Sequence, residues 1–310
     1  MSIDVLKSTF ESIQHGTDWS LQLLRITTSK RDGTKYASRQ IVLEPANRLD
    51  SFVRDLAVRY LGTEKGSLSK YTSVTAYDGT TDGLTIYKMD KGNNLISEEY
   101  ENFIVAIGNP DVEADCMSFK SAYVIKGSTF VGDEDTPVKL VSMQNPITTL
   151  KHKFSLARDT GKFKELDSQI LSLRPTLDIV IIGSTVYFFT MNGENLFHME
   201  RAYKSVCQST INAIETANMV SGFEIFKSVA GTGHNPRRFV AFDNDRFEAL
   251  KNTKTRKAMA KQFGIPLDAD GKLDATVAGA AERIVKVLCN KGMVDPFKKA
   301  PVEVSGAKPW

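Results

Sequence analysis

Residues 177–203 constrain the fold of this chain more than any other segment. A short apolar run at 177–182 meets a Gly-Ser pair, and a second run of β-branched and aromatic residues follows at 185–190. Two such runs around a tight turn predict a β-hairpin with buried strands. An Asn-Gly pair then ends the alternation, and apolar residues take up a helical spacing over 196–216. The chain is therefore expected to contain a buried hairpin followed directly by a helix.

This order of a strand, a tight turn, an aromatic strand, a polar turn and a helix resembles the KwaB-like family of the Kiwa antiphage defence systems. The resemblance is strongest over residues 177–226 and contains no catalytic signature. It implies a cytosolic, dimeric protein that binds phage DNA beside a small membrane-spanning partner (KwaA-like) at the inner face of the membrane. No binding residue of the family can be matched by motif, so the candidates below come from charge placement alone.

The fold class predicted from the sequence is α+β, with a sheet-rich N-terminal half and a helix-rich C-terminal half. Apolar runs flank an Asp-Gly turn within residues 18–44, which predicts a strand pair, and residues 96–107 have a helical pattern. Helices dominate from residue 192 onward. We expect two domains, a sheet-rich one at 1–145 and a hairpin plus helices at 146–310, although no clean linker marks their boundary.

Composition limits where the chain acts. Its longest nearly unbroken apolar run, 179–189, is about half of what a membrane helix needs. The three cysteines show no paired spacing, which is typical of reduced thiols in a cytoplasmic protein. Residues 226–310 contain 16 Lys or Arg against 9 Asp or Glu, a net charge of +7, and the rest of the chain has −4. We therefore expect a cytoplasmic protein whose C-terminal part meets a polyanion, with chance unevenness of charge as the alternative.

The sequence contains no complete catalytic, nucleotide-binding or metal-binding motif. The acidic group Asp133, Glu134 and Asp135 could ligate a metal ion, but contiguous acids in an extended segment point in different directions. We therefore predict no catalytic residue, no metal site, no cofactor and no small-molecule substrate. An enzyme, here a divergent metal-dependent nuclease that uses these three acids, stays the alternative, because a missing motif is weak evidence against activity.

Basic residues gather in two neighbouring C-terminal elements. A Gly-rich loop ends in two arginines that can adapt to phosphates, and a single helix over 245–263 is expected to carry a cationic stripe about four turns long. The predicted DNA-binding residues are Arg237, Arg238, Arg246, Lys254, Arg256, Lys257 and Lys261. Such a stripe contacts the phosphate backbone and does not read bases.

Three interpretations of the basic residues stay open at this point. The first is a DNA-binding protein that is not an enzyme and does not read sequence. The second is a solvated helix face that only keeps the protein soluble, and the third is a scaffold whose basic face docks an acidic protein. If DNA does not bind at the stripe, the next candidates are Lys151, Lys153, Arg158 and Lys162.

Overall fold

The chain forms two compact units, which we describe separately. The computed structural model describes residues 3–29, 33–44, 48–63, 66–79, 83–111, 118–131, 134–149, 156–159, 162–165, 169–289, 292–295 and 301–303. The first unit, here the sheet unit, comprises Met1–Ala76 and Gly83–His198, and the second, the helical unit, comprises Tyr77–Asp82 and Met199–Trp310. The contacts thus divide the chain at residue 199, whereas the sequence suggested a boundary at 145.

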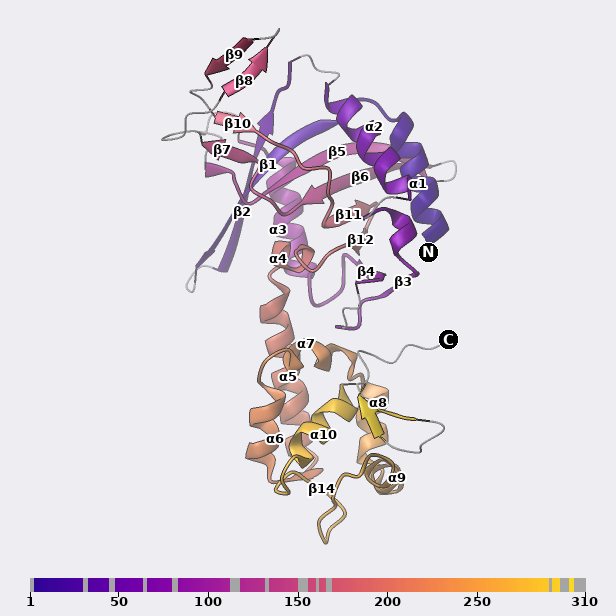
Figure 1. Cartoon of the computed structure of the whole chain (residues 1–310). Coiled ribbons are helices and arrows are strands. Elements are labelled where there is room, and N and C mark those ends of the chain that lie inside the picture. The colour runs from indigo at the N-terminus through magenta and orange to yellow at the C-terminus, as the bar shows by residue number, and fades with distance from the viewer. Residues whose placement is uncertain are drawn as a thin grey trace. The chain divides into compact units, whose positions relative to one another are not determined.

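The sheet unit is built on an eight-stranded sheet (Figure 1). Its strand order is β2-β1-β5-β6-β11-β12-β4-β3, and every neighbouring pair is antiparallel except β3 with β4. The strands of this sheet are β1 (Ser20–Ser29), β2 (Gly33–Ile41), β3 (Ser73–Ala76), β4 (Thr85–Asp90), β5 (Ala122–Val131), β6 (Glu134–Ser142), β11 (Ile179–Ile182) and β12 (Thr185–Phe188).

Two small antiparallel pairs and several helices complete the sheet unit. The pairs join β7 with β10 and β8 with β9. The remaining elements of this unit are α1 (Ile3–His15), α2 (Arg48–Leu61), η1 (Leu68–Lys70), α3 (Ser97–Gly108), α4 (Gly193–Leu196), β7 (Ile147–Thr149), β8 (Leu156–Asp159), β9 (Lys162–Glu165) and β10 (Gln169–Leu171).

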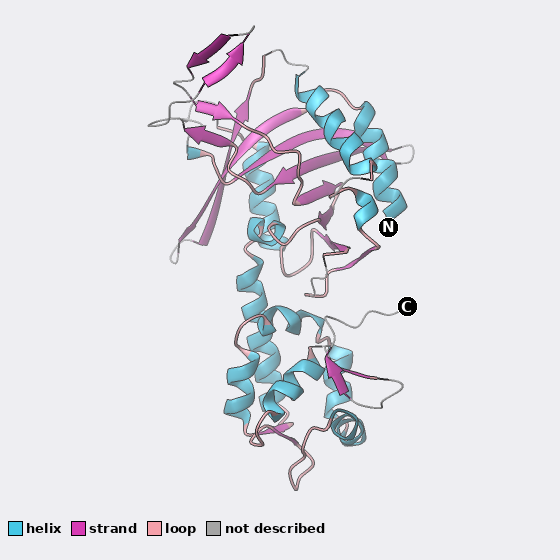
Figure 2. Cartoon of the chain, viewed as in Figure 1, coloured by secondary structure: helices cyan, strands magenta, loops and turns pink. Residues whose placement is uncertain are grey.

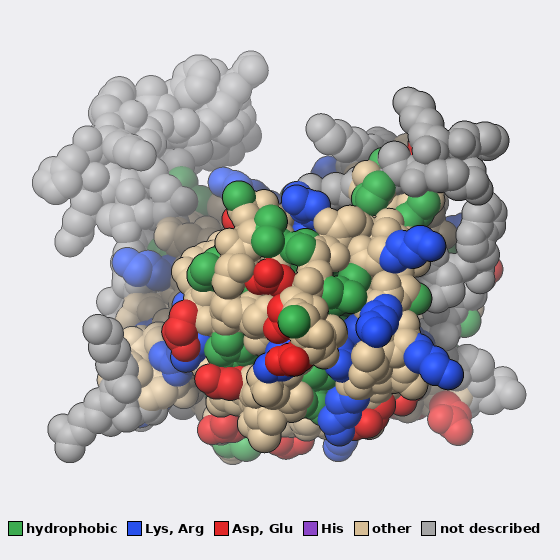
Figure 3. All heavy atoms as spheres, turned by 90° about the horizontal axis from the view of Figure 1, so that it is seen from below, with side chains coloured by type: hydrophobic (Ala, Val, Ile, Leu, Met, Phe, Trp, Pro, Cys, Tyr) green, Lys and Arg blue, Asp and Glu red, His purple; other side chains and the backbone are tan. Residues whose placement is uncertain are grey.

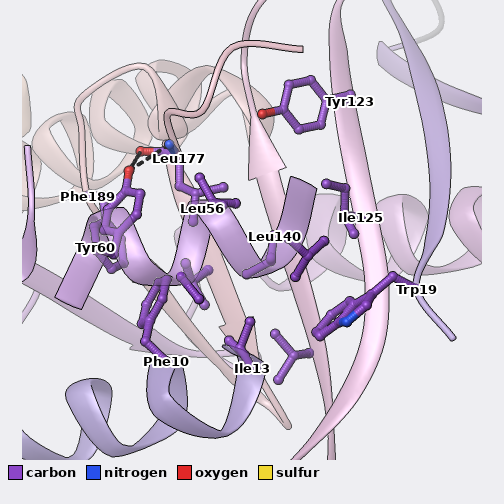
Figure 4. Packing of buried hydrophobic residues seen from close by; sticks show 14 of the residues in the cluster. Phe10, Ile13, Trp19, Leu56, Tyr60, Tyr123, Ile125, Leu140, Leu177 and Phe189 are labelled. Carbon is purple, nitrogen blue, oxygen red and sulfur yellow. Dashed lines mark hydrogen bonds between the residues drawn. The ribbon is translucent and has the colours of Figure 1, made fainter. Parts of the chain in front are cut away.

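Alternation along the strands gives the sheet two apolar faces. Side chains such as Tyr123, Ile125 and Leu140 face α1 and α2 and form one large core (Figure 4). Residues in between point to the opposite face. There Gln22 donates a hydrogen bond to the Ile107 carbonyl of α3 at 3.1 Å. α3 therefore covers this second face at β1 and β2. All four residues of β11, in the interior of the sheet, are buried.

The core facing α1 and α2 also contains polar atoms that are satisfied internally. The backbone N–H of Leu177 donates to the Tyr60 hydroxyl at 2.7 Å (Figure 4). The Tyr71 hydroxyl donates to the Phe189 carbonyl at 2.9 Å. Burial raises the pKa of Tyr71 to about 12, because the charged phenolate would lose its hydration. These hydroxyls fix the chain on either side of the hairpin.

The helical unit is a cluster of short helices with little sheet (Figure 2). Its apolar core includes Phe226, Phe239 and Ile284, each almost fully buried. The elements of this unit are α5 (Met199–Thr216), β13 (Val220–Ser221), α6 (Phe223–Ala230), α7 (Asn235–Arg238), η3 (Phe239–Ala241), α8 (Asn244–Lys251), α9 (Thr253–Phe263), β14 (Leu273–Asp274), α10 (Ala280–Leu288), β15 (Gly292–Val294) and β16 (Pro301–Glu303).

The α+β prediction is confirmed, with a large sheet in the N-terminal part and a helix-rich C-terminal half. The predicted hairpin is present, since β11 pairs with β12 across Gly183 and Ser184. The predicted strand pair is present as β1 and β2, and the helix at 96–107 as α3. None of the helices in the described ranges is long and apolar enough to cross a lipid bilayer.

Candidate nucleic-acid interface

All seven predicted DNA-binding residues belong to the helical unit, but they do not lie on one continuous helix. The predicted helix 245–263 is wrong, because α8 ends at Lys251 and α9 begins at Thr253. Asn252 between them has an extended backbone, with φ −71° and ψ 115°. Its side-chain oxygen accepts a hydrogen bond from the Lys254 N–H at 2.9 Å and so caps α9. The stripe of four turns is therefore interrupted, and Arg246 stands on a different helix.

Three lysines remain together on α9. Lys254, Lys257 and Lys261 are exposed and follow one another at spacings of three and four residues, which places them on one side of the helix. We refer to these three residues as the lysine face. The sequence of α9 contains no acid, and among the described residues none of these lysines forms an ion pair with a carboxylate. The lysine face is therefore not closely paired with any described carboxylate.

The space-filling view supports this uneven distribution of charge. Seen from below, several Lys and Arg side chains gather on the right of the face, whereas Asp and Glu side chains lie mostly toward its centre and lower left (Figure 3). On the neighbouring α8, by contrast, Lys251 forms an ion pair with Glu248 at 2.8 Å. The carboxylate of Asp243 is engaged with the N–H of Arg246 at the start of the same helix. Lys251 of α8 is thus paired with a carboxylate, whereas the three lysines of α9 form no close ion pair with a described carboxylate.

Arg256 lies in the interior of the helical unit. Its residue is 9% exposed. The guanidinium donates to the carbonyls of Leu250 and Lys251 at 2.8 and 2.7 Å and to the carbonyl of Gly271 at 3.3 Å. A further bond reaches the Thr253 hydroxyl at 3.2 Å. Arg256 therefore satisfies the C-terminal carbonyls of α8 and joins α8, α9 and the 268–272 turn, and it is not part of the exposed lysine face.

The two arginines of the predicted Gly-rich loop lie on the short helix α7, so the expectation of a flexible arginine loop is wrong. Arg237 and Arg238 are both half-buried. The Arg237 Nε donates to the Tyr77 hydroxyl at 2.8 Å, and its guanidinium lies 5.8 and 6.0 Å from the ring centres of Tyr77 and Tyr203. These contacts fix the Arg237 guanidinium, because each uses part of its donor set or its flat face.

The contact that holds Arg237 is one that sequence analysis missed. The hydroxyls of Tyr77 and Tyr203 are 2.6 Å apart, and their rings are parallel to within 5°. Gly79 approaches the Arg237 carbonyl so closely that a Cβ would lie 2.2 Å from that oxygen. No local sequence signal links segment 77–79 to a helix about 160 residues later.

The acids suggested for a metal site do not form one in the described residues. Asp133 lies outside them, and Glu134 and Asp135 are exposed neighbours at the start of β6, where successive side chains point to opposite faces. No group of three or more His, Cys, Asp or Glu side chains suited to a metal ion occurs in the part of the chain that the structure describes. Lys151 and Lys153 lie outside that part, and the side chains of Arg158 and Lys162 are likewise not described.

One of the two described buried thiols of the helical unit, that of Cys207, does not have the character of a nucleophile. Cys207 on α5 is 2% exposed, and burial raises its pKa to about 11. A thiol with such a raised pKa stays protonated at neutral pH, so it lacks the thiolate that nucleophilic chemistry requires.

Comparison with known proteins gives one finding. A family model described as Kiwa protein KwaB-like matches residues 133–294, which is just over half of the 310 residues. The matched range contains β6, the hairpin of β11 and β12, and the helical unit through β15, including the lysine face. No curated protein and no solved structure matches the chain.

Proposed function

Because the chain belongs to the KwaB-like family of Kiwa proteins, we propose that it acts in Kiwa antiphage defence by binding DNA without reading its sequence. The observation that carries this proposal is the lysine face of α9, where three exposed lysines are free of ion pairs with described carboxylates. Arg246 of α8 and Arg238 of α7, both half-buried, would extend the contact surface. Arg237 and Arg256 would support that surface from within, since their donors are already engaged.

The geometry of the lysine face fits phosphates better than bases. Lys261 follows Lys254 by seven positions, which is about 10 Å along a helix axis. One strand of duplex DNA carries about one phosphate per 3.4 Å of the helix axis, so that length matches roughly three phosphates of one strand. Lysine offers a compact charge on a flexible stem and lacks the planar fork that reads guanine. Each of the three lysines can therefore find a phosphate, whatever the sequence.

The experiment that tests this proposal is a salt series with a charge variant. Lys254, Lys257 and Lys261 are replaced together by Gln, and binding to a duplex of arbitrary sequence is followed by fluorescence anisotropy. The plot of log affinity against log salt should flatten by up to about three units, because each lost phosphate contact removes about one. An unchanged affinity and slope would show the lysine face to be a solvated surface.

A matched control separates the site from net charge. Lys7, Lys91 and Lys204 are exposed lysines outside α9, and their replacement by Gln removes the same three charges. This control should bind DNA with nearly the parent slope. Incubation of the parent with DNA and Mg²⁺ or Mn²⁺ should leave the DNA intact, whereas cleavage would favour the alternative of a metal-dependent nuclease. Retention of an acidic protein but of no DNA would favour the scaffold.

We further propose that the protein works as a homodimer and is held at the inner face of the membrane by a small transmembrane partner of the KwaA type. Family membership supports this arrangement. A neighbouring gene for a small multi-helix membrane protein is expected, and co-expression of the two should move this chain into the membrane fraction. Light scattering should give twice the chain mass of 34.3 kDa. A monomer, or a chain that stays in the supernatant with its partner present, would contradict this part.

A further inference from the structure

Lys139 of β6 is a half-buried cation in the interior of the eight-stranded sheet. It lies directly opposite Lys126 of β5 on one side and Ile181 of β11 on the other. Its neighbours Val138 and Leu140 belong to the core that faces α1 and α2, so alternation turns Lys139 to the opposite face of the sheet. Lys126 contacts α3 on that same face. Two positively charged side chains therefore stand next to one another there.

Lys126 has a structural role. Its Nζ donates to the Ile107 carbonyl at 2.8 Å, and Gln22 donates to the same oxygen at 3.1 Å. This carbonyl lies in the last turn of α3, where the carbonyls of a helix have no partner within the helix and attract positive charge. Lys126 therefore stabilises the C-terminal end of α3.

Lys139 has no such role within the described chain, where its ammonium group forms no hydrogen bond and no ion pair with another residue. Asp135 is the only acid among the positions on the same face of β5, β6 and β11, and it lies four residues along the strand, about 13 Å away. Burial, and then the charge of Lys126, lower the pKa of Lys139, because both disfavour its charged form. The folded sheet therefore gains nothing from this charge.

An anion between the two lysines would remove their repulsion and accept their hydrogen bonds. Like charges directly opposite one another on neighbouring strands are destabilising, and the Cβ atoms of such a pair are about 4.5 to 5.5 Å apart. Two lysine side chains at this spacing can reach the same tetrahedral group. A terminal phosphate carries nearly two negative charges at pH 7 and three acceptor oxygens, so it balances both lysines, whereas a carboxylate balances one.

We propose that Lys126 and Lys139 together bind a doubly charged phosphate group, which is inorganic phosphate or the terminal phosphate of a small molecule or of a DNA strand. Lys139 supplies the main contact, and Lys126 shares its remaining hydrogens while it keeps its bond to Ile107. The site belongs to the sheet unit, and it does not depend on DNA binding by the lysine face of α9. Because the two lysines are neighbours only in the folded sheet, the bound phosphate stabilises that fold.

The test is calorimetric titration of the whole chain with inorganic phosphate at constant ionic strength, with acetate as the singly charged comparison. Phosphate should bind the parent at least about tenfold more tightly than acetate, and Lys139→Met should weaken phosphate binding by at least about tenfold, because one charge-assisted contact is lost. Lys139→Arg keeps the charge and should keep the binding. No binding to the parent, equal binding of phosphate and acetate, or an unchanged affinity in Lys139→Met would overturn the proposal.

A matched control comes from the other face of the sheet. Lys88 of β4 is also a half-buried strand lysine, and it follows Ile86 of the core facing α1 and α2 by two positions. Lys88→Met should therefore bind phosphate like the parent. A loss in Lys88→Met as large as that in Lys139→Met would refute a site at Lys139, because it would show a response to total charge.

The lysine face is tested in the same titration, because it too could attract phosphate. The Gln variant of Lys254, Lys257 and Lys261 should bind inorganic phosphate like the parent, whatever its affinity for DNA. If this variant loses phosphate and Lys139→Met keeps it, the phosphate binds at α9 and the proposed site is wrong.

Competition in the background of that Gln variant identifies the source of the phosphate group. Displacement of inorganic phosphate by adenosine monophosphate alone assigns a small molecule, and displacement also by an oligonucleotide with a 5′-phosphate assigns a strand end. Displacement by neither assigns inorganic phosphate itself. An oligonucleotide with a 5′-hydroxyl has only singly charged phosphates and should not compete. Equal competition by the two oligonucleotides would contradict the requirement for a doubly charged group.

Discussion

The sheet unit and the helical unit use their polar side chains in opposite ways. In the sheet unit, the hydroxyls of Tyr60, Tyr71 and Tyr123 lie in the core and bond to backbone groups more than 50 residues away. In the helical unit, most of the charge on α9 faces solvent, and Arg256 alone among its basic residues is buried. The polar groups of the sheet unit serve the fold, whereas the ammonium groups of the lysine face form no hydrogen bond or ion pair with another described residue. A group that the fold does not need is available for binding.

The largest expected effect comes from placing a charge in the sheet. Ile181 of β11 is fully buried, so Ile181→Asp should lower the free energy of unfolding by about 3 to 4 kcal/mol, because the carboxylate would lose its hydration and Lys139, which lies directly opposite, would offset only part of that loss. Thermal unfolding followed by circular dichroism measures this loss.

The matched control for this change is Val42→Asp, since Val42 is 82% exposed and the same substitution there should alter stability by less than about 0.5 kcal/mol. If Ile181→Asp melted at the parent temperature, β11 would be exposed in solution. The sheet unit would then not have the buried core on which the comparison with the helical unit depends.

The next effect separates a structural cation from the surface ones. Arg256→Met removes donors from the carbonyls of Leu250 and Lys251 and should cost about 2 to 3 kcal/mol. Lys257→Met, on the same helix but exposed, should change stability by less than about 0.5 kcal/mol. Urea unfolding measures both variants.

DNA binding should respond in the reverse order. At a temperature where both variants are folded, Lys257→Met should flatten the salt dependence by about one unit and Arg256→Met should leave it unchanged. If the slope of log affinity against log salt also flattened in the Arg256 variant, Arg256 would belong to the DNA-binding surface.

The break between α8 and α9 shows where sequence analysis reached its limit. The hairpin at 179–188 and the strand pair at 20–41 could be predicted, because alternation and turn residues are local signals. The helical spacing across 245–263 was also a local signal, but it did not reveal that Asn252 caps a new helix. The burial of Arg256 depends on the turn at Gly271, and that of Arg237 on Tyr77, so neither contact has a local signature.

A moderate effect should appear at alkaline pH. Burial raises the pKa of Tyr123 and of Tyr187 to about 12, against 10.0 for an unburied tyrosine. The folded sheet unit favours the neutral phenol, so this stability is present below pH 10 and is lost as the pH rises from 10 toward 12. In the helical unit, the pKa of Cys207 is raised from 9.0 to about 11, so its contribution is lost over pH 9 to 11.

Trp19, 7% exposed in the core of the sheet unit, reports this loss. In a Trp310→Phe background, the free energy of unfolding, obtained from urea titrations followed by Trp19 fluorescence, should fall between pH 10 and 11. Tyr123→Phe should reduce this fall in the free energy of unfolding by up to about 1 kcal/mol, because it removes one titrating group from the core. A fall that is equally steep in this variant would show that Tyr123 is ionised freely in the folded protein.

The smallest expected effect concerns two lysines that the sheet unit does not expose fully. Lys126 of β5 and Lys139 of β6 are directly opposite one another, and Lys139 is also opposite Ile181 of β11. Burial, and then the charge of Lys126, lower the pKa of Lys139. Because the unfolded chain binds this proton more tightly, the sheet unit should gain stability as the pH rises toward 10.5.

Lys139→Met should raise the free energy of unfolding at pH 7 by about 0.2 to 1 kcal/mol and remove part of that pH dependence. Lys126→Met is the informative comparison, since Lys126 donates to the Ile107 carbonyl at 2.8 Å and its loss leaves that acceptor with one bond fewer. If Lys139→Met instead destabilised the protein, Lys139 would stabilise the sheet unit, as the buried tyrosines do.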